Sequence, residues 1–470
     1  MDRIYGEQPA GKDRFGKDWN GIKGTCFWKA PHFNRRMFFQ HMSSAVGGYF
    51  LMPSRPMETV AKAAVTPINK ARNVIFIMMG GGPSHIDTFD LKEGSWLPGS
   101  YEPTSYGGVR WPRGLFPKIA EQMESVALLR SVKPWAAVHE LASTWLQIGR
   151  NPVSALSRIA PHIGSVVSLE FGQRGGDKTL PPFFNLNTGG GPGVGYLPPA
   201  FAPFYFSPGG NPPSGTTHPD GPLAFDRRFA LLNDLDSEMR GKGVLGAKGD
   251  EMTAFNASAR QLMYRSEIDN LFRFSADERT RYGSTGFGNA LIVARNLLAS
   301  DRGTRYVQVN AGGWDNHANI YTGALNPSNA NSLARQFDTA LGALLADTKA
   351  SGLLDQTLIV AMGEFGRTIG MPNTTVGRDH FLQQAALVAG AGIKGQRAIG
   401  STDAVGRDTV DPGWSRNRSI RAEDIEATIY SALGIDWTTV RRDDPLGRGF
   451  EYVPFSDQDL YGPIHELWQG

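Results

Sequence analysis

The chain has 470 residues, of which 40% are hydrophobic, 20% charged and 10% aromatic, and this composition excludes a disordered protein. Its 48 Lys and Arg against 45 Asp and Glu leave a net charge of +3, so no global field indicates nucleic acid or an anionic membrane as a partner. Cys26 is the one cysteine, which excludes a disulfide framework, a zinc–thiolate site and an iron–sulfur cluster. The length suits one large α/β domain or two modest ones.

Residues 1–70 have the pattern of a targeting segment and linker. Arg35 and Arg36 form a twin-arginine pair ahead of a mildly apolar run over 42–52, and an Ala-x-Ala spacing follows at 61–63. We therefore expect export by the twin-arginine route to the periplasm or the extracellular space. The alternative is an amphipathic surface helix after a disordered N-terminus. No run of 18 apolar residues occurs, so we expect no transmembrane span.

Beyond residue 70 the pattern predicts an α/β fold. Five apolar runs have the length of buried strands, at 74–79, 125–129, 306–309, 357–361 and 385–389. Helical periodicity lies between them, over 333–351 with Gly352 as a C-cap candidate and over 425–433. Strands that alternate with helices indicate crossover connections and a mostly parallel sheet.

The regular pattern is interrupted from 172 to 285. Glycine- and proline-rich loops come first, and a helical stretch over 226–282 follows. Long ordered loops in compact domains usually serve a function, so we interpret 172–285 as a cap-like insertion over the sheet.

Polar side chains gather where the predicted strands end. In an open α/β sheet, ligands bind beyond the carboxyl ends of the strands. Imidazoles and carboxylates that converge from separate strand ends suit a hydrolytic metal site, with zinc or manganese favoured and calcium or magnesium left open. The alternative is that each residue caps a helix or is solvated on its own. The gathered residues are His85, Asp87, Asp315, His317, Glu364, Arg367, Arg378 and His380.

Four segments in chain order carry a resemblance to a known family. They are MGGGPSHIDTFD at 79–90, GWDNH at 313–317, GEFGRT at 363–368 and GRDH at 377–380. The chain resembles the bacterial family called domain of unknown function 1501, which is often labelled sulfatase-like and placed in the alkaline phosphatase superfamily. The resemblance implies a three-layer sandwich over 71–470, with a central mostly parallel sheet and a metal site above the strand ends. It implies no known substrate.

Several superfamily positions hold a different residue in this chain. The metal-binding Asp after the first strand corresponds to Gly81, with Asp87 as a substitute a few residues on. The nucleophile of phosphatases and sulfatases opens a helix that ends at a glycine about ten residues later. Counting back from Gly149 leads to His139, and the sulfatase cysteine motif is absent.

The remaining ligand positions are partly kept. The Asp of the Asp-x-x-x-His pair corresponds to Gly313, so it is lost unless Asp315 replaces it. The later Asp-His pair corresponds to Glu364 and Phe365, which keeps one oxygen ligand and loses an imidazole. The resemblance therefore implies one metal held by the retained set and disfavours a two-metal centre. That set is His317, Glu364 and His380, with Asp315, His85 and Asp87 as further candidates.

Three other residues have predicted roles near the reaction centre. His139 is a direct nucleophile, a general acid or an extra ligand, or else a histidine bonded to backbone at a helix start. Arg367 and Arg378 are placed to hold an oxyanion bidentately, or else they bridge loop carboxylates.

Two hypotheses of different class follow from these residues. The first is an exported, mononuclear, metal-dependent hydrolase of phosphate or sulfate esters that acts on a small-molecule or glycan ester. The second is a catalytically degenerate member that works as a binding or assembly subunit.

Overall fold

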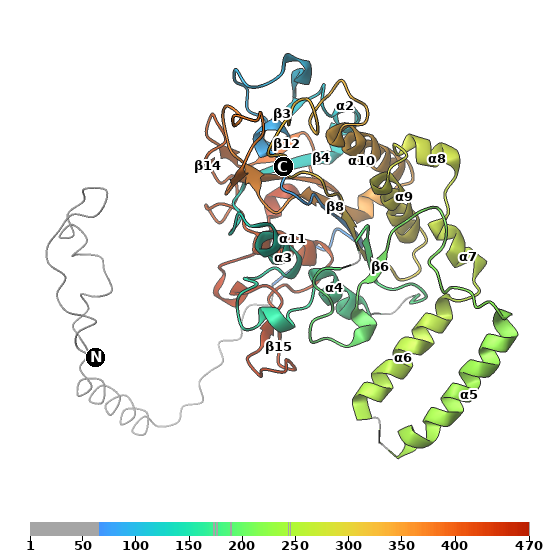
Figure 1. Cartoon of the computed structure of the whole chain (residues 1–470). Coiled ribbons are helices and arrows are strands. Elements are labelled where there is room, and N and C mark those ends of the chain that lie inside the picture. Colours follow the sequence, from blue (N-terminus) through green and yellow to red (C-terminus); the bar gives the residue numbers. More distant parts are fainter. Residues whose placement is uncertain are drawn as a thin grey trace, which may run out of the picture. The chain divides into compact units, whose positions relative to one another are not determined.

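The computed structural model describes residues 65–469 except 173, 175, 176, 189, 243 and 245. Its centre is an eight-stranded sheet in the order β12-β4-β11-β8-β1-β7-β5-β6 (Figure 1). Every neighbouring pair is parallel except the two that involve β11. The predicted α/β class with a mostly parallel sheet is confirmed. The strands are β1 (Asn73–Met78), β4 (Val126–Val132), β5 (Phe183–Leu186), β6 (Phe204–Phe206), β7 (Tyr306–Asn310), β8 (Thr357–Met362), β11 (Gln384–Gly390) and β12 (Arg397–Ile399).

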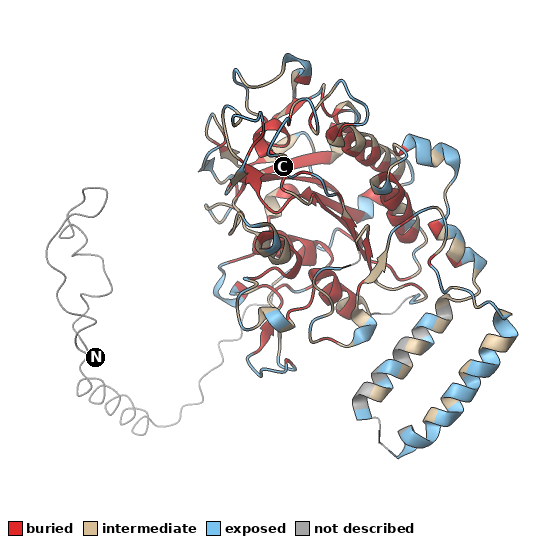
Figure 2. Cartoon of the chain, in the orientation of Figure 1, coloured by how far each residue is buried: buried red, intermediate tan, exposed pale blue. Residues whose placement is uncertain are grey.

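Helices cover both faces of this sheet. On one face, alternate residues of β1 such as Ile75 and Ile77 pack in a core with α2 (Pro117–Ala120), α9 (Gly286–Ala299) and α10 (Leu333–Ala350). On the other face, Val74 and Phe76 pack in a core with α3 (His139–Ile148), α4 (Ile163–Gly172) and α11 (Ala422–Ala432). Figure 2 shows the sheet and the inner sides of these helices as buried. Because successive side chains of a strand point to opposite faces, a fully apolar strand such as β1 fits between two helical layers.

The predicted strands and helices have local causes that the structure makes visible. All five apolar runs form strands of the central sheet. The Ser332 hydroxyl accepts from the Arg335 amide and caps the start of α10, as an N-cap serine does. Gly352 adopts φ 72° directly after Ser351, which is the C-cap of that helix.

The segment 172–285, which we interpreted as a cap-like insertion, contributes two strands to the central sheet. Strands β5 and β6 lie within it and extend the central sheet at the edge beyond β7. Its helical part consists of the paired helices α5 (Gly221–Gly241) and α6 (Gly246–Leu262), then α7 (Ser266–Asp269) and α8 (Ala276–Arg281). Only this helical part is therefore an addition outside the sheet.

Four two-stranded sheets complete the described chain. They pair β2 (Pro103–Tyr106) with β3 (Val109–Pro112), β9 (Gly366–Arg367) with β10 (His380–Phe381), β13 (Ser401–Thr402) with β14 (Thr409–Asp411), and β15 (Val440–Arg441) with β16 (Phe450–Glu451). None of the helices in the described part is long and apolar enough to cross a membrane. The twin-arginine pair and the Ala-x-Ala spacing lie outside the described residues.

The topology brings distant segments to one edge of the sheet. The carboxyl ends of β1, β4, β7 and β8 share this edge because the four strands run in one direction. Strand β11 runs the opposite way, so its amino end, which follows β10, reaches the same edge. His139, Asp315, Glu364 and His380 therefore all come from connections at one edge.

Candidate metal centre

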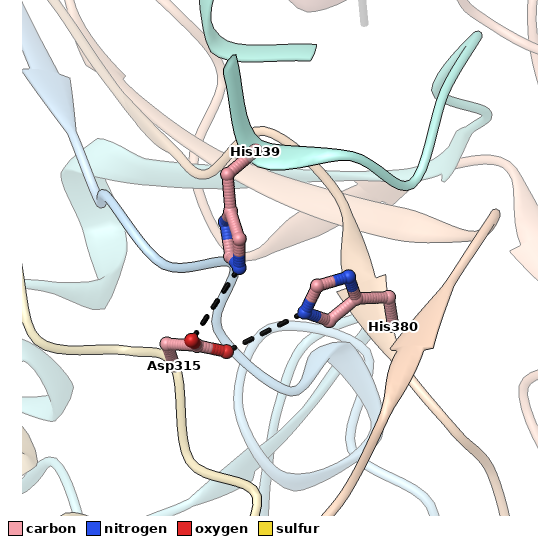
Figure 3. Close-up of side chains that lie close together, drawn as sticks. All are labelled: His139, Asp315 and His380. Atoms are coloured by element: carbon pink, nitrogen blue, oxygen red, sulfur yellow. Dashed lines mark ion pairs between the residues drawn. The ribbon is translucent and has the colours of Figure 1, made fainter. Parts of the chain in front are cut away.

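Three side chains form a compact group at the carboxyl edge of the sheet. His139, Asp315 and His380 each offer a ligand atom, and these atoms all lie within 4.8 Å of one another (Figure 3). His139 Nε2 lies 3.4 Å from Asp315 Oδ2, and His380 Nε2 lies 3.5 Å from Asp315 Oδ1. Two imidazoles and a carboxylate are donors that suit zinc, manganese or a similar divalent ion.

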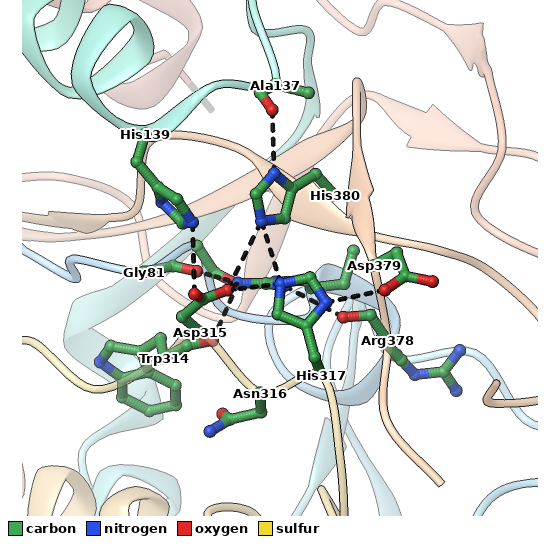
Figure 4. Close-up of polar contacts among 12 residues, drawn as sticks. Gly81, Ala137, His139, Trp314, Asp315, Asn316, His317, Arg378, Asp379 and His380 are labelled. Carbon is green, nitrogen blue, oxygen red and sulfur yellow. Dashed lines mark hydrogen bonds and ion pairs between the residues drawn. The ribbon is translucent and has the colours of Figure 1, made fainter. Parts of the chain in front are cut away.

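His317 adjoins this group. Its Nε2 lies 2.9 Å from Asp315 Oδ1 and 3.2 Å from His380 Nε2 (Figure 4). The predicted pair of His317 and His380 thus meets at one point, and Asp315 stands between them and His139.

The second nitrogen of each imidazole contacts an oxygen that fixes its protonation. His380 Nδ1 donates to the Ala137 carbonyl at 2.9 Å, His139 Nδ1 to Glu364 Oε1 at 2.6 Å, and His317 Nδ1 to an Asp379 carboxylate oxygen at 2.7 Å. A carbonyl or carboxylate oxygen can only accept here, so Nδ1 carries the proton in each ring. His139 and His380 therefore direct Nε2 toward Asp315, which is how protein imidazoles are oriented toward a metal, whereas His317 Nε2 lies at hydrogen-bond distance from Asp315 Oδ1.

Two nitrogen atoms at this point have no settled hydrogen-bond partner. Nε2 of His317 and Nε2 of His380 face each other, and two lone pairs at 3.2 Å repel unless a cation or proton lies between them. His139 Nε2 is buried and has no hydrogen-bond partner among the described residues. A divalent ion fits the set of His139, Asp315 and His380 because it would accept the lone pairs of both Nε2 atoms and balance the carboxylate.

Arg367 is the positive charge that the structure already places beside the group. Its Nη2 lies 2.5 Å from Asp315 Oδ1, and its Nη1 lies 3.3 Å from His317 Nε2. Burial raises the pKa of Asp315, but the hydrogen bond and charge of Arg367 outweigh it and lower that pKa to about 2. Asp315 is therefore ionised at neutral pH and available as an oxygen ligand.

The rest of the Arg367 guanidinium is taken up by backbone. Its Nε donates to the Gly82 carbonyl at 2.7 Å, its Nη1 to the Arg378 carbonyl at 3.0 Å, and its Nη2 to the Gly81 carbonyl. These contacts tie the connection after β1 to the segment before β10. Arg367 therefore acts as a buried brace of the site, and its predicted hold on an oxyanion stays a prediction.

Arg378 lies deeper still. Its side chain and that of Asp87 are both fully buried, with Nε 2.6 Å from Asp87 Oδ2, and its Nη2 donates to the Tyr321 hydroxyl at 2.7 Å. The expectation that Asp87 supplies a metal ligand does not fit this pairing, because the carboxylate is occupied by a buried guanidinium. Neither does a substrate contact from Arg378 fit its complete burial.

His85 is the second predicted ligand that lies outside the group. Its Nε2 contacts the Gly406 carbonyl at 2.8 Å, and its Nδ1 accepts from the Arg367 amide at 3.4 Å. Both ring nitrogens are thereby engaged, and burial lowers the pKa of His85. A neutral, buried and fully bonded imidazole is a structural residue, so the expectation that His85 binds an ion does not fit these contacts.

Glu364 supports the group from beneath. Its side chain is 3% exposed, and its Oε1 accepts from both His139 Nδ1 and the Gly81 amide, the latter at 2.9 Å. The predicted ligand carboxylate is thus held behind His139. Its Oε2 is buried without a hydrogen-bond partner among the described residues, so it remains available for a further contact.

Gly81 holds the position at which the resemblance implied a metal-binding aspartate. Its φ is 105°, and an added Cβ would lie 2.4 Å from the Asp315 amide nitrogen. No other residue fits there without displacing the segment that carries Asp315. Asp315 instead delivers a carboxylate to the centre from after β7, at the position that the sequence identified as a replacement.

The start of α3 positions His139. The helix begins at His139 and ends at Gly149, which adopts φ 59° as its C-cap. An added Cβ on Gly149 would lie 1.6 Å from Glu426 Oε2, so this position requires glycine. Among the described residues, no side chain caps the amino end of α3, the end that carries His139.

Two groups of the centre were missed as functional residues by sequence reasoning. Asp379 orients His317, and the Ala137 carbonyl orients His380. Asp379 had a signal, since it lies beside His380 in the GRDH segment. The Ala137 carbonyl had none, because a backbone acceptor is not specified by residue type.

The fold and the site together define an α/β protein with a histidine–carboxylate group at the carboxyl edge of a mostly parallel sheet. The chain belongs to the DUF1501 family, since the family model described as "Protein of unknown function (DUF1501)" matches residues 71–457. No curated protein sequence matches the chain.

Solved structures of low sequence identity resemble the chain. Ps i-CgsB in complex with k-i-k-neocarrahexaose has 12% identity and a TM-score of 0.40, and the match covers 84% of this chain and 78% of that one. PsFucS1 sulfatase from Pseudoalteromonas sp. has 15% identity and a TM-score of 0.35, with 78% and 68% covered. TAB5 alkaline phosphatase, in a variant with bound Mg, has 13% identity and a TM-score of 0.34, with 79% and 99% covered.

Proposed function

We propose that this protein is an exported, mononuclear, metal-dependent hydrolase of phosphate or sulfate esters. The observation that carries the proposal is the convergence of His139, Asp315 and His380 within 4.8 Å of one another, with Nδ1 of each imidazole against an oxygen and Nε2 toward Asp315. His139, Asp315 and His380 would hold the ion, and His317 is the nearest further ligand. When bound, zinc or manganese would supply a Lewis acid beside the ester.

The side chains of this chain would prepare the site for an anionic ester. The group lies beside the uncapped start of α3, which carries His139, and the positive end of a helix dipole attracts phosphate and sulfate. Asp315, His317 and His380 are 46%, 45% and 25% exposed in their side chains, so a substrate reaches them from solvent. A small-molecule or glycan ester is the proposed substrate.

His139 is held in a fixed orientation for its role. It stands at the start of α3 with Glu364 behind its Nδ1, a pairing that keeps the proton on Nδ1 and orients the ring. We assign it the role of a ligand in the ion-bound state. The alternative roles of general acid or nucleophile require its Nε2 to leave the group.

A second function has one specific observation in its favour. Arg367 already contacts both Asp315 and His317 with its guanidinium, so this arginine can balance the charge of Asp315 in place of a metal ion. In that case the chain is a degenerate member of its fold that works as a binding or assembly subunit.

Metal analysis combined with activity assays separates the two functions. The purified chain is analysed for bound metal and assayed with 4-nitrophenyl phosphate and 4-nitrophenyl sulfate, with zinc, manganese, calcium or magnesium added. The hydrolase predicts a bound divalent ion and turnover of one ester class that a chelator abolishes. Absence of both metal and turnover would retire the hydrolase in favour of the binding subunit.

Export is part of the proposal and has its own test. It rests on Arg35 and Arg36 with the apolar run and the Ala-x-Ala spacing that follow. Replacing both arginines by lysine should block appearance of the protein outside the cytoplasm, and unchanged secretion of that variant would contradict the twin-arginine route.

A further inference from the structure

The opposite edge of the sheet contains a large cavity. It has a volume of about 680 Å³, within the range of small-molecule sites. Residues that immediately precede strands line it, including Arg72 before β1, Arg305 before β7 and Pro203 before β6. Because these strands are parallel, their amino ends lie at the edge away from His139, Asp315 and His380. The cavity is therefore separate from the candidate metal centre.

The walls of this amino-edge cavity are mainly apolar. Phe171 and Phe201 contribute aromatic rings, prolines at the strand starts add rigid apolar surface, and Ala259 and Leu262 of α6 form the outer wall. Burying a hydrocarbon chain against such walls is favourable at roughly 25 cal/mol per Å² of apolar surface. The cavity thus suits an apolar ligand of considerable length.

Its charge is strongly one-sided. Among the described residues that line it, Arg72, Arg174, Lys178 and Arg305 are cationic, and Asp177 is the one carboxylate. Asp177 is occupied by the amide and hydroxyl of Thr179, at 2.8 and 2.6 Å. The lining therefore attracts an anionic group.

The cations retain donors for such a group. Arg72 and Arg305 share one carboxylate, that of Asp301, at 2.6 and 2.9 Å. Arg174 donates to the carbonyls of Leu433 and Gly434 at 3.3 and 3.1 Å, and its guanidinium lies 4.3 Å from the centre of the Phe171 ring. An arginine has five N–H donors, so each guanidinium keeps donors that these contacts do not use. Charge and apolar surface meet at Phe171.

We propose that the amino-edge cavity binds an anionic amphiphile, with a hydrocarbon chain along the aromatic and proline walls and its carboxylate or phosphate at the arginines. Charge complementarity selects the anionic head, and the apolar volume selects the chain. The proposal does not depend on the hydrolase function, because no residue of the metal centre lines this cavity.

The test uses the full chain and three soluble probes in titration calorimetry: dodecanoate, dodecyl phosphate and dodecyltrimethylammonium. Ala259→Trp adds a bulky side chain at a cavity-lining position of α6, and Ala257→Trp makes the same change at a position of that helix that does not line the cavity; both alanines are exposed. We expect both anions to bind the wild type. A259W should weaken their affinity about tenfold or more by displacing their apolar contacts, and A257W should leave the affinity unchanged.

Vesicles distinguish a free amphiphile from a membrane lipid as the source. If the protein sediments with phosphatidylglycerol vesicles and A259W reduces this, the ligand is a membrane lipid. If only dodecanoate binds, the ligand is a free amphiphile. Both outcomes support the site. Equal binding of the cationic probe, or binding that A259W leaves unchanged with every probe and vesicle, overturns it. The metal content of A259W should equal that of the wild type, which keeps this outcome distinct from failure of the hydrolase function.

Discussion

The two edges of the same sheet are built in opposite ways. At the carboxyl edge, polar side chains are held by one another: three imidazoles, Asp315 and Arg367 lie in mutual contact, and a fully buried ion pair braces them from below. At the amino edge, a cavity of about 680 Å³ is left between apolar walls, and its cations make solvent-facing contacts such as Arg72 with Asp301.

The difference shows which site in this fold requires side chains in fixed positions and which does not. Holding several charged groups at one point costs desolvation, which only a dense network of partners offsets. A site that requires fixed geometry is therefore packed and braced, as at the carboxyl edge. A site that sorts ligands by charge and apolar surface tolerates open volume, as at the amino edge.

The largest expected effect is at the carboxyl edge. Asp315→Asn removes the charge that the three imidazoles face while it preserves shape. We expect loss of bound metal and a fall in activity beyond the about 10–100-fold that replacing an outer-shell partner causes. Asp379→Asn is the matched control because Asp379 contacts only the Nδ1 side of His317, so its loss should stay within that range. Metal analysis and kcat/KM measure both, and equal effects would contradict the assigned ligand group.

A stability contrast between the edges comes next. Asp87→Ala leaves the Arg378 guanidinium buried and without its carboxylate, and removing one partner of a buried pair costs about 3–5 kcal/mol. Asp301→Ala removes an amino-edge carboxylate that is 47% exposed, and exposed pairs contribute about 0.2–1 kcal/mol. Denaturant unfolding measures both free energies, and similar losses for the two variants would break the comparison.

An effect that is spread over a range of pH concerns Glu426, which lies beside the end of α3. Burial raises the pKa of Glu426 to about 8 from an ordinary 4.5, so the folded state retains a proton that the unfolded state releases. Since the unfolded state then binds fewer protons between those two values, stability falls as the pH rises through this window.

Glu426→Gln tests this pH dependence. The variant carries no ionisable group there, so its stability relative to the wild type should rise from pH 5 to pH 9. Melting temperatures at pH 5, 7 and 9 provide the measurement. Glu121→Gln at an exposed surface pair is the control, with no expected trend. A parallel pH profile for E426Q and the wild type would show that Glu426 titrates normally.

Much of the fold could be predicted because burial on both faces leaves a plain signal. Continuous apolar runs such as 74–79 are strands in the structure, since a parallel sheet under two helical layers needs apolar residues at every position. Strands β5 and β6 were not predicted because they have only four and three residues and lie among proline- and glycine-rich loops.

The candidate site could be predicted only as a set of residues. The strand-end rule brought His317, His380 and Asp315 to one edge, as the structure does. Sequence could not reveal that Glu364 turns toward His139, nor that Asp87 pairs with Arg378, because both contacts join segments more than 200 residues apart. Tertiary packing decides which carboxylate is free to bind an ion and which pairs with a neighbouring side chain.

The most direct test is a crystal structure of the full chain grown with manganese, with anomalous diffraction to locate the ion. The account predicts one strong peak within bonding distance of His139 Nε2, the Asp315 carboxylate and His380 Nε2. A map without a peak there, with the Arg367 guanidinium still against Asp315, would contradict it.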